Sequence, residues 1–369
     1  MNIKKVDIYK LDVSREYAIR VPIGILSSAE NVAVKITTEQ GIYGWGEASP
    51  FAPITGDCQD SNFITAGKLA ALIKGKDAMD TESRMREINR FVVGQPSIRS
   101  AFDIALYDLR AKAAGLPLYA LLGGGRREIC TDLTIGLQDT VDETVAFAQR
   151  ILAKGFDAIK LKVGRSGLED VKHIKAVRQL VGPHIALKID SNQGWTYQEA
   201  VANILAMAPL NLQYSEQPLA AWDFQNMRRL REKVDLPICA DESVFDDKDA
   251  LKLVSSGAVD YLNIKLGKSG GIHTGLNINA IAQAAGNRCM IGCFAESRLG
   301  LSAAAHLAMA RPNIHYVDLD SAFKFNEDPV LGGMTYDKSG GGLLHVPEVP
   351  GHGAEFDEDY LGRGEHYFV

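Results

Sequence analysis

The sequence predicts an α/β fold in which an α+β domain precedes a barrel of eight parallel strands. Strand-like runs recur after residue 125, and their starts are 27, 27, 27, 25, 24, 27 and 27 residues apart. Segments with helical period, such as residues 170–180 and 197–207, fill the gaps. Eight strands alternating with helices at this period are typical of a (β/α)8 barrel. The runs start at Thr131, Ala158, Ile185, Leu212, Pro237, Tyr261, Arg288 and His315.

The first part of the chain, residues 1–124, has the pattern of a smaller α+β domain. Residues 32–38 and 42–46 are strand-like and flank a short turn that ends at Gly41. We expect residues 19–28 to form a mixed apolar loop, because proline and glycine interrupt them. A second loop is expected at residues 50–57. Apolar loops of this kind pack against another element or lie over a ligand.

Helical spacing of apolar residues dominates from about residue 60 to 120 and ends near Gly115 and Pro117. The glycines at 123–125 then indicate a boundary. We therefore divide the chain into a capping domain (1–124), a catalytic barrel (125–320) and a terminal segment (321–369). That last segment is rich in glycine and proline, and we expect it to return to the capping domain.

Composition limits the classes of partner. Of the 369 residues, 46% are hydrophobic, and the net charge is −6 without a Lys/Arg-rich block, which argues against binding nucleic acid. No run of 18 apolar residues suggests a membrane span. Charged residues follow Met1 within a few positions, so the apolar core of a signal peptide is missing. With five scattered cysteines, a reducing cytoplasm is favoured.

Charged residues gather where the predicted barrel strands end. Lys160 and Lys162 alternate in the second strand and therefore share a face, although an edge strand with solvated lysines would give the same pattern. Asp190, Glu216 and Asp241 end the next three strands. Any one of these acids could be a helix N-cap, but three bare carboxylates on adjacent strands would repel one another. A hard divalent cation removes that repulsion, and Mg2+, with Mn2+ as the alternative, suits such oxygen ligands better than zinc does.

Opposite strands of an eight-stranded ring face each other across its mouth. Lys162 on the second strand should therefore face Lys265 on the sixth, and the metal acids should face Asp318 and Asp320 on the eighth. A substrate between them would place an anionic group on the metal and a carbon between the lysines. Metal and ammonium charges would depress a lysine pKa toward that of a general base, and the ion would stabilise an enolate. Bases on both faces of a carbon indicate racemisation or epimerisation.

These residues resemble the enolase superfamily, its muconate-lactonizing enzyme subgroup and, within that, the Ala-Glu epimerase-like dipeptide epimerases. The resemblance spans essentially the whole chain. It is carried by Lys160-x-Lys162, the three strand-end acids and Lys265, and the Asp318-x-Asp320 pair points to dipeptide epimerases. It implies a modified TIM barrel, (β/α)7β, with an α+β cap built from the N-terminal region and the C-terminal tail. Homo-oligomers are usual in such a family.

The resemblance also implies roles for these residues. Lys162 and Lys265 would be the acid/base catalysts that invert the Cα of a dipeptide's C-terminal residue by 1,1-proton transfer through a metal-stabilised enolate. Lys160 would steady Lys162 and contact the substrate carboxylate, and the paired acids would hold the substrate's ammonium group. We interpret Lys268, three residues after Lys265, as a loop lysine.

The side-chain specificity of the enzyme is expected to depend on the first capping loop. Ala-Glu epimerases carry an arginine there, whereas the corresponding stretch here is Gly24-Ile25-Leu26. We therefore expect Ile25 to contact a small or hydrophobic second residue, unless it only packs the cap onto the barrel. Glu296, near the mouth, is a further candidate for substrate binding. Arg20 lies close in sequence, but the direction of its side chain stays open.

Other functions share part of this pattern. An o-succinylbenzoate synthase, an N-acylamino acid racemase or a muconate cycloisomerase would use the same lysines and metal acids without an ammonium-binding pair. A Schiff-base aldolase could use Lys265, but it would not need three acids. A binding protein on an inactive barrel would not need the complete set of lysines and acids.

Overall fold

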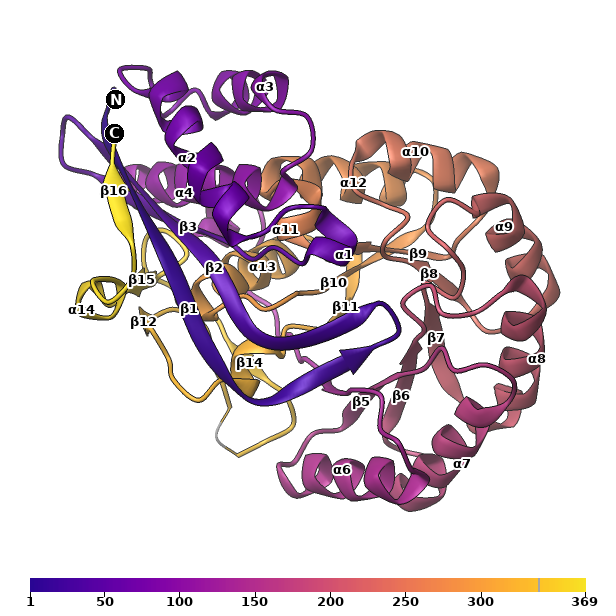
Figure 1. The fold of residues 1–369 in the computed structure, drawn as a ribbon. Helices are drawn as coiled ribbons and strands as arrows, with labels where there is room; N and C mark the ends of the chain where they lie inside the picture. The colour runs from indigo at the N-terminus through magenta and orange to yellow at the C-terminus, as the bar shows by residue number, and fades with distance from the viewer. Residues whose placement is uncertain (338) are drawn as a thin grey trace.

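The computed structural model describes residues 1–337 and 339–369 and consists of a barrel covered by a smaller α+β unit (Figure 1). The barrel sheet contains eight parallel strands in sequence order, and every predicted start lies within two residues of the observed one. The strands are β4 (Leu133–Ile135), β5 (Ala158–Lys162), β6 (Ala186–Asp190), β7 (Leu212–Glu216), β8 (Ile238–Ala240), β9 (Tyr261–Ile264), β10 (Arg288–Ile291) and β11 (Ile314–Val317).

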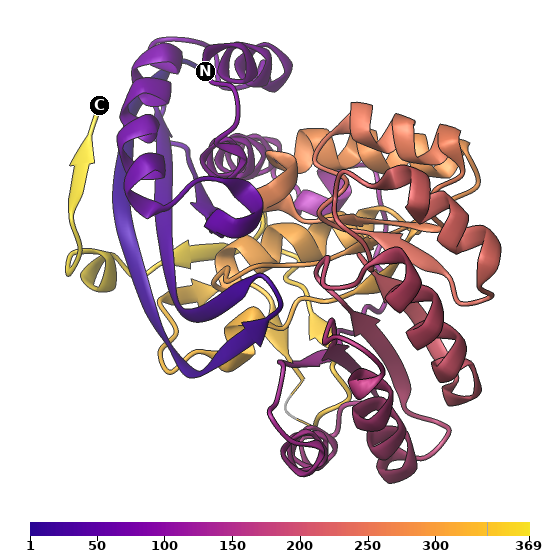
Figure 2. The same ribbon diagram turned by 45° about the vertical axis from the view of Figure 1, so that its right-hand side comes forward.

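Helices alternate with these strands and cover the outside of the barrel, as Figures 1 and 2 show. They are α6 (Val141–Ala153), α7 (Glu169–Val181), α8 (Tyr197–Met207), α9 (Phe224–Lys233), α10 (Asp247–Ser256), α12 (Ile272–Ala284) and α13 (Arg298–Ala310). Short turns η1 (Ala208–Leu210) and α11 (Leu266–Ser269) interrupt the pattern. The element directly after β11 is the 3-10 turn η2 (Ser321–Lys324) rather than a barrel helix, so the barrel is (β/α)7β as expected.

Side chains, rather than a strand ladder, join the first and last strands of the barrel. The sheet order places β4 and β11 at its two ends. The Leu319 N–H donates to Thr131 Oγ1 at 2.8 Å, and the Thr134 N–H donates to Asp320 Oδ2 at 2.7 Å. These bonds satisfy backbone donors that a ladder would otherwise use. They also fix a carboxylate at the mouth of the barrel.

The cap is built on a four-stranded antiparallel sheet in the order β16-β1-β2-β3. Its strands are β1 (Ile3–Val21), β2 (Gly24–Thr38), β3 (Tyr43–Ala48) and β16 (His366–Phe368). Apolar side chains of this sheet share a core with three helices, which are α2 (Gln59–Ile73), α3 (Thr81–Phe91) and α4 (Pro96–Ala114). The short helix α1 (Ala52–Thr55) precedes them, and α5 (Leu118–Leu121) packs into the barrel core instead.

Two of the predicted loops contain regular structure. Residues 19–28 are not a loop but the tip of the β1–β2 hairpin, where Ile19 pairs with Leu26 and Val21 with Gly24. Pro22 occupies the turn, so its missing N–H is not needed by the ladder. The tip reaches the barrel, because the Leu137 N–H donates to the Arg20 carbonyl at 2.8 Å. The expected loop at 50–57 contains α1.

The C-terminal segment contacts both units. It contains β12 (Val330–Gly332), β13 (Thr335–Tyr336), β14 (Leu344–His345), β15 (Ala354–Phe356) and α14 (Glu358–Leu361) before β16. Strand β16 pairs antiparallel with β1 and so extends the cap sheet (Figure 1). On the barrel side, the Thr131 N–H donates to the Gly342 carbonyl at 2.8 Å. Within the described residues, none of the helices combines the length and apolarity needed to cross a membrane.

Candidate active site

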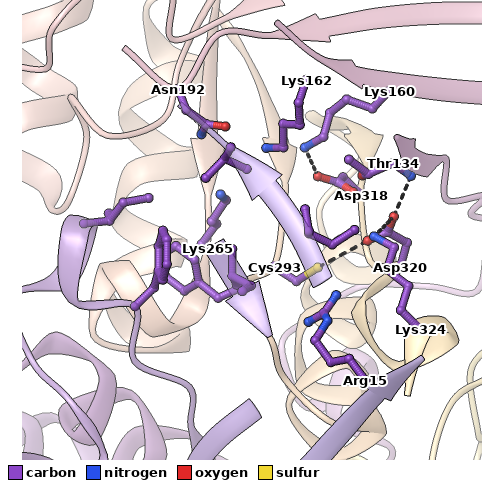
Figure 3. Close-up of a pocket in the computed structure, with 16 residues that line it drawn as sticks. Arg15, Thr134, Lys160, Lys162, Asn192, Lys265, Cys293, Asp318, Asp320 and Lys324 are labelled. Atoms are coloured by element: carbon purple, nitrogen blue, oxygen red, sulfur yellow. Dashed lines mark hydrogen bonds and ion pairs between the residues drawn. The ribbon is translucent and has the colours of Figure 1, made fainter. Parts of the chain in front are cut away.

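Lysine and aspartate side chains from several strand ends meet at a cavity beneath the β1–β2 hairpin. Five of the predicted site residues line it, and Figure 3 shows them converging on the same space. They are Lys160, Lys162, Lys265, Asp318 and Asp320. The parallel strands explain this meeting, because their carboxyl ends all open on the same face of the barrel.

The three predicted metal acids form one buried cluster. Ligand oxygens of Asp190, Glu216 and Asp241 lie within 4.8 Å of one another. Glu216 Oε2 and Asp241 Oδ1 are buried and have no hydrogen-bond partner among the described residues. The Asn263 amide orients Glu216 by donating to its Oε1 at 2.7 Å. Clustered carboxylate oxygens with free lone pairs fit a hard divalent cation such as Mg2+.

Each catalytic candidate lies against one of these acids. Lys162 Nζ is 2.5 Å from Asp190 Oδ2, and Lys265 Nζ is 2.7 Å from Asp241 Oδ2. Burial would lower the pKa of Lys265, but the carboxylates of Asp241 and Glu216 outweigh it and raise that pKa above its ordinary value. Our expectation of a lowered lysine pKa included the charge of a bound cation, whereas these carboxylates are the protein's own and act in the opposite direction. A divalent cation among those oxygens would offset their effect.

Lys160 connects the two sides of the cavity. Its ammonium group donates to Asp318, and Nζ is 3.5 Å from Glu216 Oε2 and 3.8 Å from Asp190 Oδ2. Burial opposes the charge, but these carboxylates raise the pKa of Lys160 well above its ordinary value. Lys160 is therefore a fixed cation between the predicted metal acids and the pair Asp318 and Asp320, which follow β11.

The sequence position of Lys268 suggested a loop lysine, and this interpretation is wrong. It lies on α11 and is fully buried. Its ammonium donates to the carbonyls of Val244 and Asn263, and Nζ is 3.5 Å from Asp241 Oδ1. With Lys265 it lowers the pKa of Asp241 to about 2, against the opposing effect of burial. Lys268 thus helps to keep Asp241, a predicted metal ligand, ionised.

Asp318 and Asp320, the two acids after β11, already have partners. Among the described residues, each keeps one oxygen that accepts from no nitrogen donor. Asp318 Oδ1 is buried without a partner, while Oδ2 accepts from Lys160. Asp320 Oδ2 accepts from the Thr134 N–H and from Lys324, and the Cys293 thiol is 4.0 Å from Oδ1. A ligand ammonium between the two carboxylates would therefore find an acceptor on each.

The expected specificity residues lie differently from the prediction. Ile25 is 62% exposed and lines a neighbouring cavity, whereas Leu26 lines the site. Successive side chains of a strand point to opposite faces, and a loop interpretation cannot make this distinction. Arg20 projects outward and donates to Asp139 at 2.8 Å. Glu296 is buried but is not among the lining residues, and its Oε2 accepts from the Phe294 N–H at 2.6 Å.

Apolar side chains form the wall beneath the hairpin. They come from the hairpin, from α1 and its N-terminal neighbour, and from the segment after β10, and they are Ile19, Val21, Leu26, Phe51, Ile54 and Phe294. Phe294 lies under the Lys265 ammonium, with its ring centroid 4.8 Å from Nζ. This wall offers dispersion contacts and carries no charge of its own.

Two lining cations were missed in the sequence. Lys324 pairs with Asp320 four residues earlier, and Arg15 lies on β1. The spacing of Asp320 and Lys324 could have indicated an ion pair on a helical turn. Arg15 could have been found from the alternation of β1, in which Leu11, Val13, Ile19 and Val21 are buried at the same parity.

Family comparisons cover nearly the whole chain. Residues 5–123 match the N-terminal domain of mandelate racemase / muconate lactonizing enzyme, and residues 143–360 match the family described as enolase C-terminal domain-like.

Named relatives match over the same length. The chain is 40% identical to D-Ala-D/L-Ala epimerase of Cytophaga hutchinsonii, over 98% of each chain. It is 39% identical to the hydrophobic dipeptide epimerase of Enterococcus faecalis, over 96% of this chain and 99% of the relative. A crystal structure of dipeptide epimerase from C. hutchinsonii, complexed with Mg and the dipeptide D-Ala-L-Val, superposes with a TM-score of 0.97. Its sequence is 39% identical, and 100% of each chain is covered.

Proposed function

The chain belongs to the mandelate racemase / muconate lactonizing enzyme family of the enolase superfamily, and from this premise we propose that it is a Mg2+-dependent dipeptide epimerase. The reaction inverts the Cα of the dipeptide's C-terminal residue. The observation that carries the proposal is one cavity lined by Lys162 and Lys265 from opposite strands and by Asp318, with each lysine paired to one member of the buried acid cluster. Relatives that act on dipeptides, and a neighbour that holds Mg and a dipeptide, support it.

Asp190, Glu216 and Asp241 would hold the ion. When bound, a divalent cation would bind the substrate carboxylate and stabilise the charge that develops as the adjacent carbon loses its proton. Asn263 and Lys268 keep two of the three acids oriented or ionised. Lys160 adds a fixed positive charge between this end and Asp318, where it can also meet the substrate carboxylate.

The two lysines would act on opposite faces of the carbon, one removing a proton and the other delivering a different one. One lysine, as the neutral amine, takes the Cα proton and becomes an ammonium group. The other, already an ammonium, returns a proton to the opposite face and becomes neutral. Inversion in either direction therefore requires opposite protonation states of Lys162 and Lys265.

The rest of the dipeptide is matched to the rest of the cavity. Asp318 and Asp320 would bind the α-ammonium group through their Oδ1 atoms, of which that of Asp318 is unpartnered and that of Asp320 accepts only from the Cys293 thiol among the described residues. The side chain of the second residue would lie on the apolar wall, so we propose a small or hydrophobic residue there. Leu26 takes the position at which we expected Ile25 to contact this side chain.

Hydrogen exchange at the Cα tests the proposed function. The enzyme is incubated with Mg2+ and a dipeptide library in D2O, and products are analysed by mass spectrometry. Dipeptides with an apolar second residue should gain one deuterium and yield the epimer. The proposal fails if no dipeptide incorporates deuterium while the ion is present.

Asp318 separates the dipeptide reaction from N-acylamino acid racemisation. Asp318→Asn should reduce kcat/KM for a free dipeptide by about 10-fold or more, because a charge-assisted hydrogen bond to the ammonium group is lost. The ratio of free to N-acetylated dipeptide turnover is the readout. An equal loss on both substrates would favour the racemase.

A further inference from the structure

Arg15 is a buried cation on the cavity-facing side of β1. Along this strand, odd-numbered residues from Leu11 to Val21 turn inward, and even-numbered ones such as Arg20 are exposed. Arg15 is only 8% exposed and lines the cavity. Figure 3 shows its guanidinium group directed toward Cys293, on the side of the cavity that holds Asp320 and Lys324.

Within the part of the chain that the structure describes, no carboxylate forms an ion pair with this guanidinium. Its Nε and Nη1 are buried and have no hydrogen-bond partner among the described residues. The nearest aromatic support is Phe325, whose ring centroid is 5.4 Å from the guanidinium carbon. Burial lowers the pKa of Arg15, and Asp320 opposes this effect only through space. Buried donors without acceptors are costly, so their retention at a cavity indicates that a ligand supplies the acceptor.

The charge at this end of the cavity points to the sign of that ligand group. Lys160 and Lys324 already pair with Asp318 and Asp320, and Glu296 acts on Arg15 only through space, so the described carboxylates leave Arg15 without an ion-pair partner. The α-ammonium group of a dipeptide would add a further positive charge in a mostly buried space. A carboxylate on the same part of the substrate would balance this charge and supply acceptor oxygens to Arg15.

We propose that Arg15 binds a carboxylate on the end of the substrate remote from the reacting carbon, and that the preferred dipeptides carry Glu or Asp as their first residue. An N-acyl group that ends in a carboxylate, such as succinyl, has the same chemistry. The unpartnered Oδ1 of Asp318 and the Oδ1 of Asp320, which meets only a thiol among the described residues, favour the dipeptide, because a succinyl compound has no ammonium group to bind there. This inference rests on the proposed function and adds the first-residue class to it.

The test compares first residues of similar length. Deuterium incorporation at the leucine Cα is measured for L-Glu-L-Leu, L-Met-L-Leu and N-succinyl-L-leucine, with kcat and KM determined separately. The Glu-first dipeptide should exceed the Met-first one in kcat/KM by roughly 10- to 100-fold, mainly through KM. In Arg15→Met this ratio should fall to about 1, while Arg15→Lys should retain part of it because the charge remains.

Arg20→Met is the matched control, because Arg20 lies on the same strand and points away from the cavity. It should keep the wild-type ratio, and thermal melting of each variant checks folding. A ratio unchanged in both folded Arg15 variants would overturn the inference, as would a wild-type preference for the Met-first dipeptide. Faster exchange of the succinyl compound than of either dipeptide would overturn the assignment of the carboxylate to the first residue of a dipeptide. Exchange of none of the three would instead count against the proposed function.

Discussion

Removing one charge from the acid cluster should weaken stabilisation of the protein by Mg2+. Glu216→Gln is the most conservative change, because a glutamine oxygen can still accept the Asn263 hydrogen bond that Glu216 Oε1 accepts at 2.7 Å. The variant loses the charge on Oε2, which has no hydrogen-bond partner among the described residues. The substitution therefore tests ion binding with little change in packing.

The magnitude follows from linkage and chain length. An ion at 100 times its Kd stabilises the folded state by about 2.7 kcal/mol. Unfolding entropy of about 2.1 cal/mol/K per residue over 369 residues gives roughly 0.8 kcal/mol/K, so the Tm should rise by about 3–4 °C. A tenfold weaker affinity reduces the gain at the same Mg2+ concentration to about 1.4 kcal/mol, or about 2 °C.

Thermal melts in EDTA and then in Mg2+ measure both shifts at one pH. Glu232→Gln serves as the control, because Glu232 is on the exposed face of α9 and pairs only with Arg228 among the described residues. It should keep the full Mg2+ shift. An equal shift in Glu216→Gln and the wild type would refute the assignment of the ion to this cluster.

Two further predictions concern specificity and pH. Leu26→Arg should raise the preference for Glu over Leu as the second residue by about 10-fold, measured as a ratio of kcat/KM, because it places a cation in the apolar wall. The same change at Ile25, which is 62% exposed, should leave that ratio unchanged. Burial, aided by the charge of His352, lowers the pKa of His306 to about 3, so the unfolded chain takes up a proton below about pH 6.5 that the folded protein excludes. His306 should therefore contribute a loss of about 2 kcal/mol in the free energy of unfolding between pH 7.5 and pH 5, and His306→Asn should remove that part of the pH dependence in denaturant titrations.

Different results would contradict each of these. Equal changes in preference at Leu26 and Ile25 would mean that the alternation of β2 does not set which side chain faces the substrate. Identical pH dependence in His306→Asn and the wild type would mean that this buried histidine does not exclude a proton. His306→Asn also alters the hydrogen bond from the Tyr119 N–H. A resulting change in the free energy of unfolding that is the same at every pH does not affect the slope of that free energy against pH, which is the quantity compared.

The barrel was predictable because its physics is local in sequence. A parallel strand covered on both faces needs an apolar run, and charges can follow only where the strand reaches the mouth. The repeat therefore placed every barrel strand start within two residues. The opposition of Lys162 and Lys265 follows from strand order alone, and both line the same cavity.

The hairpin over the site was harder to predict. Strand β1 is 19 residues long, and its pairing with β2 is irregular between Ser14 and Ile19. Pro22 and Gly24 then resemble loop residues, although they form the hairpin's turn and its first strand position. Interpreting residues 19–28 as a loop ignored the alternation that places Leu26 and Ile25 on opposite faces. It also cut short the inward-facing row of β1 residues to which Arg15 belongs. The contacts that pair a buried donor come from segments far apart in the sequence. A short stretch of sequence therefore cannot show that the Arg15 donors stay unpaired.

The central claim is that one lysine removes the Cα proton and the other delivers a different proton to the opposite face of the same carbon. Its most direct test is exchange of the Cα hydrogen in D2O, followed by NMR, for Lys162→Ala and Lys265→Ala with each epimer of a substrate dipeptide. Each variant should lose epimerisation, yet it should still exchange the hydrogen of the one epimer that presents it to the remaining lysine, and the two variants should act on opposite epimers. Exchange of both epimers by either variant, or of the same epimer by both, would contradict the two-base account.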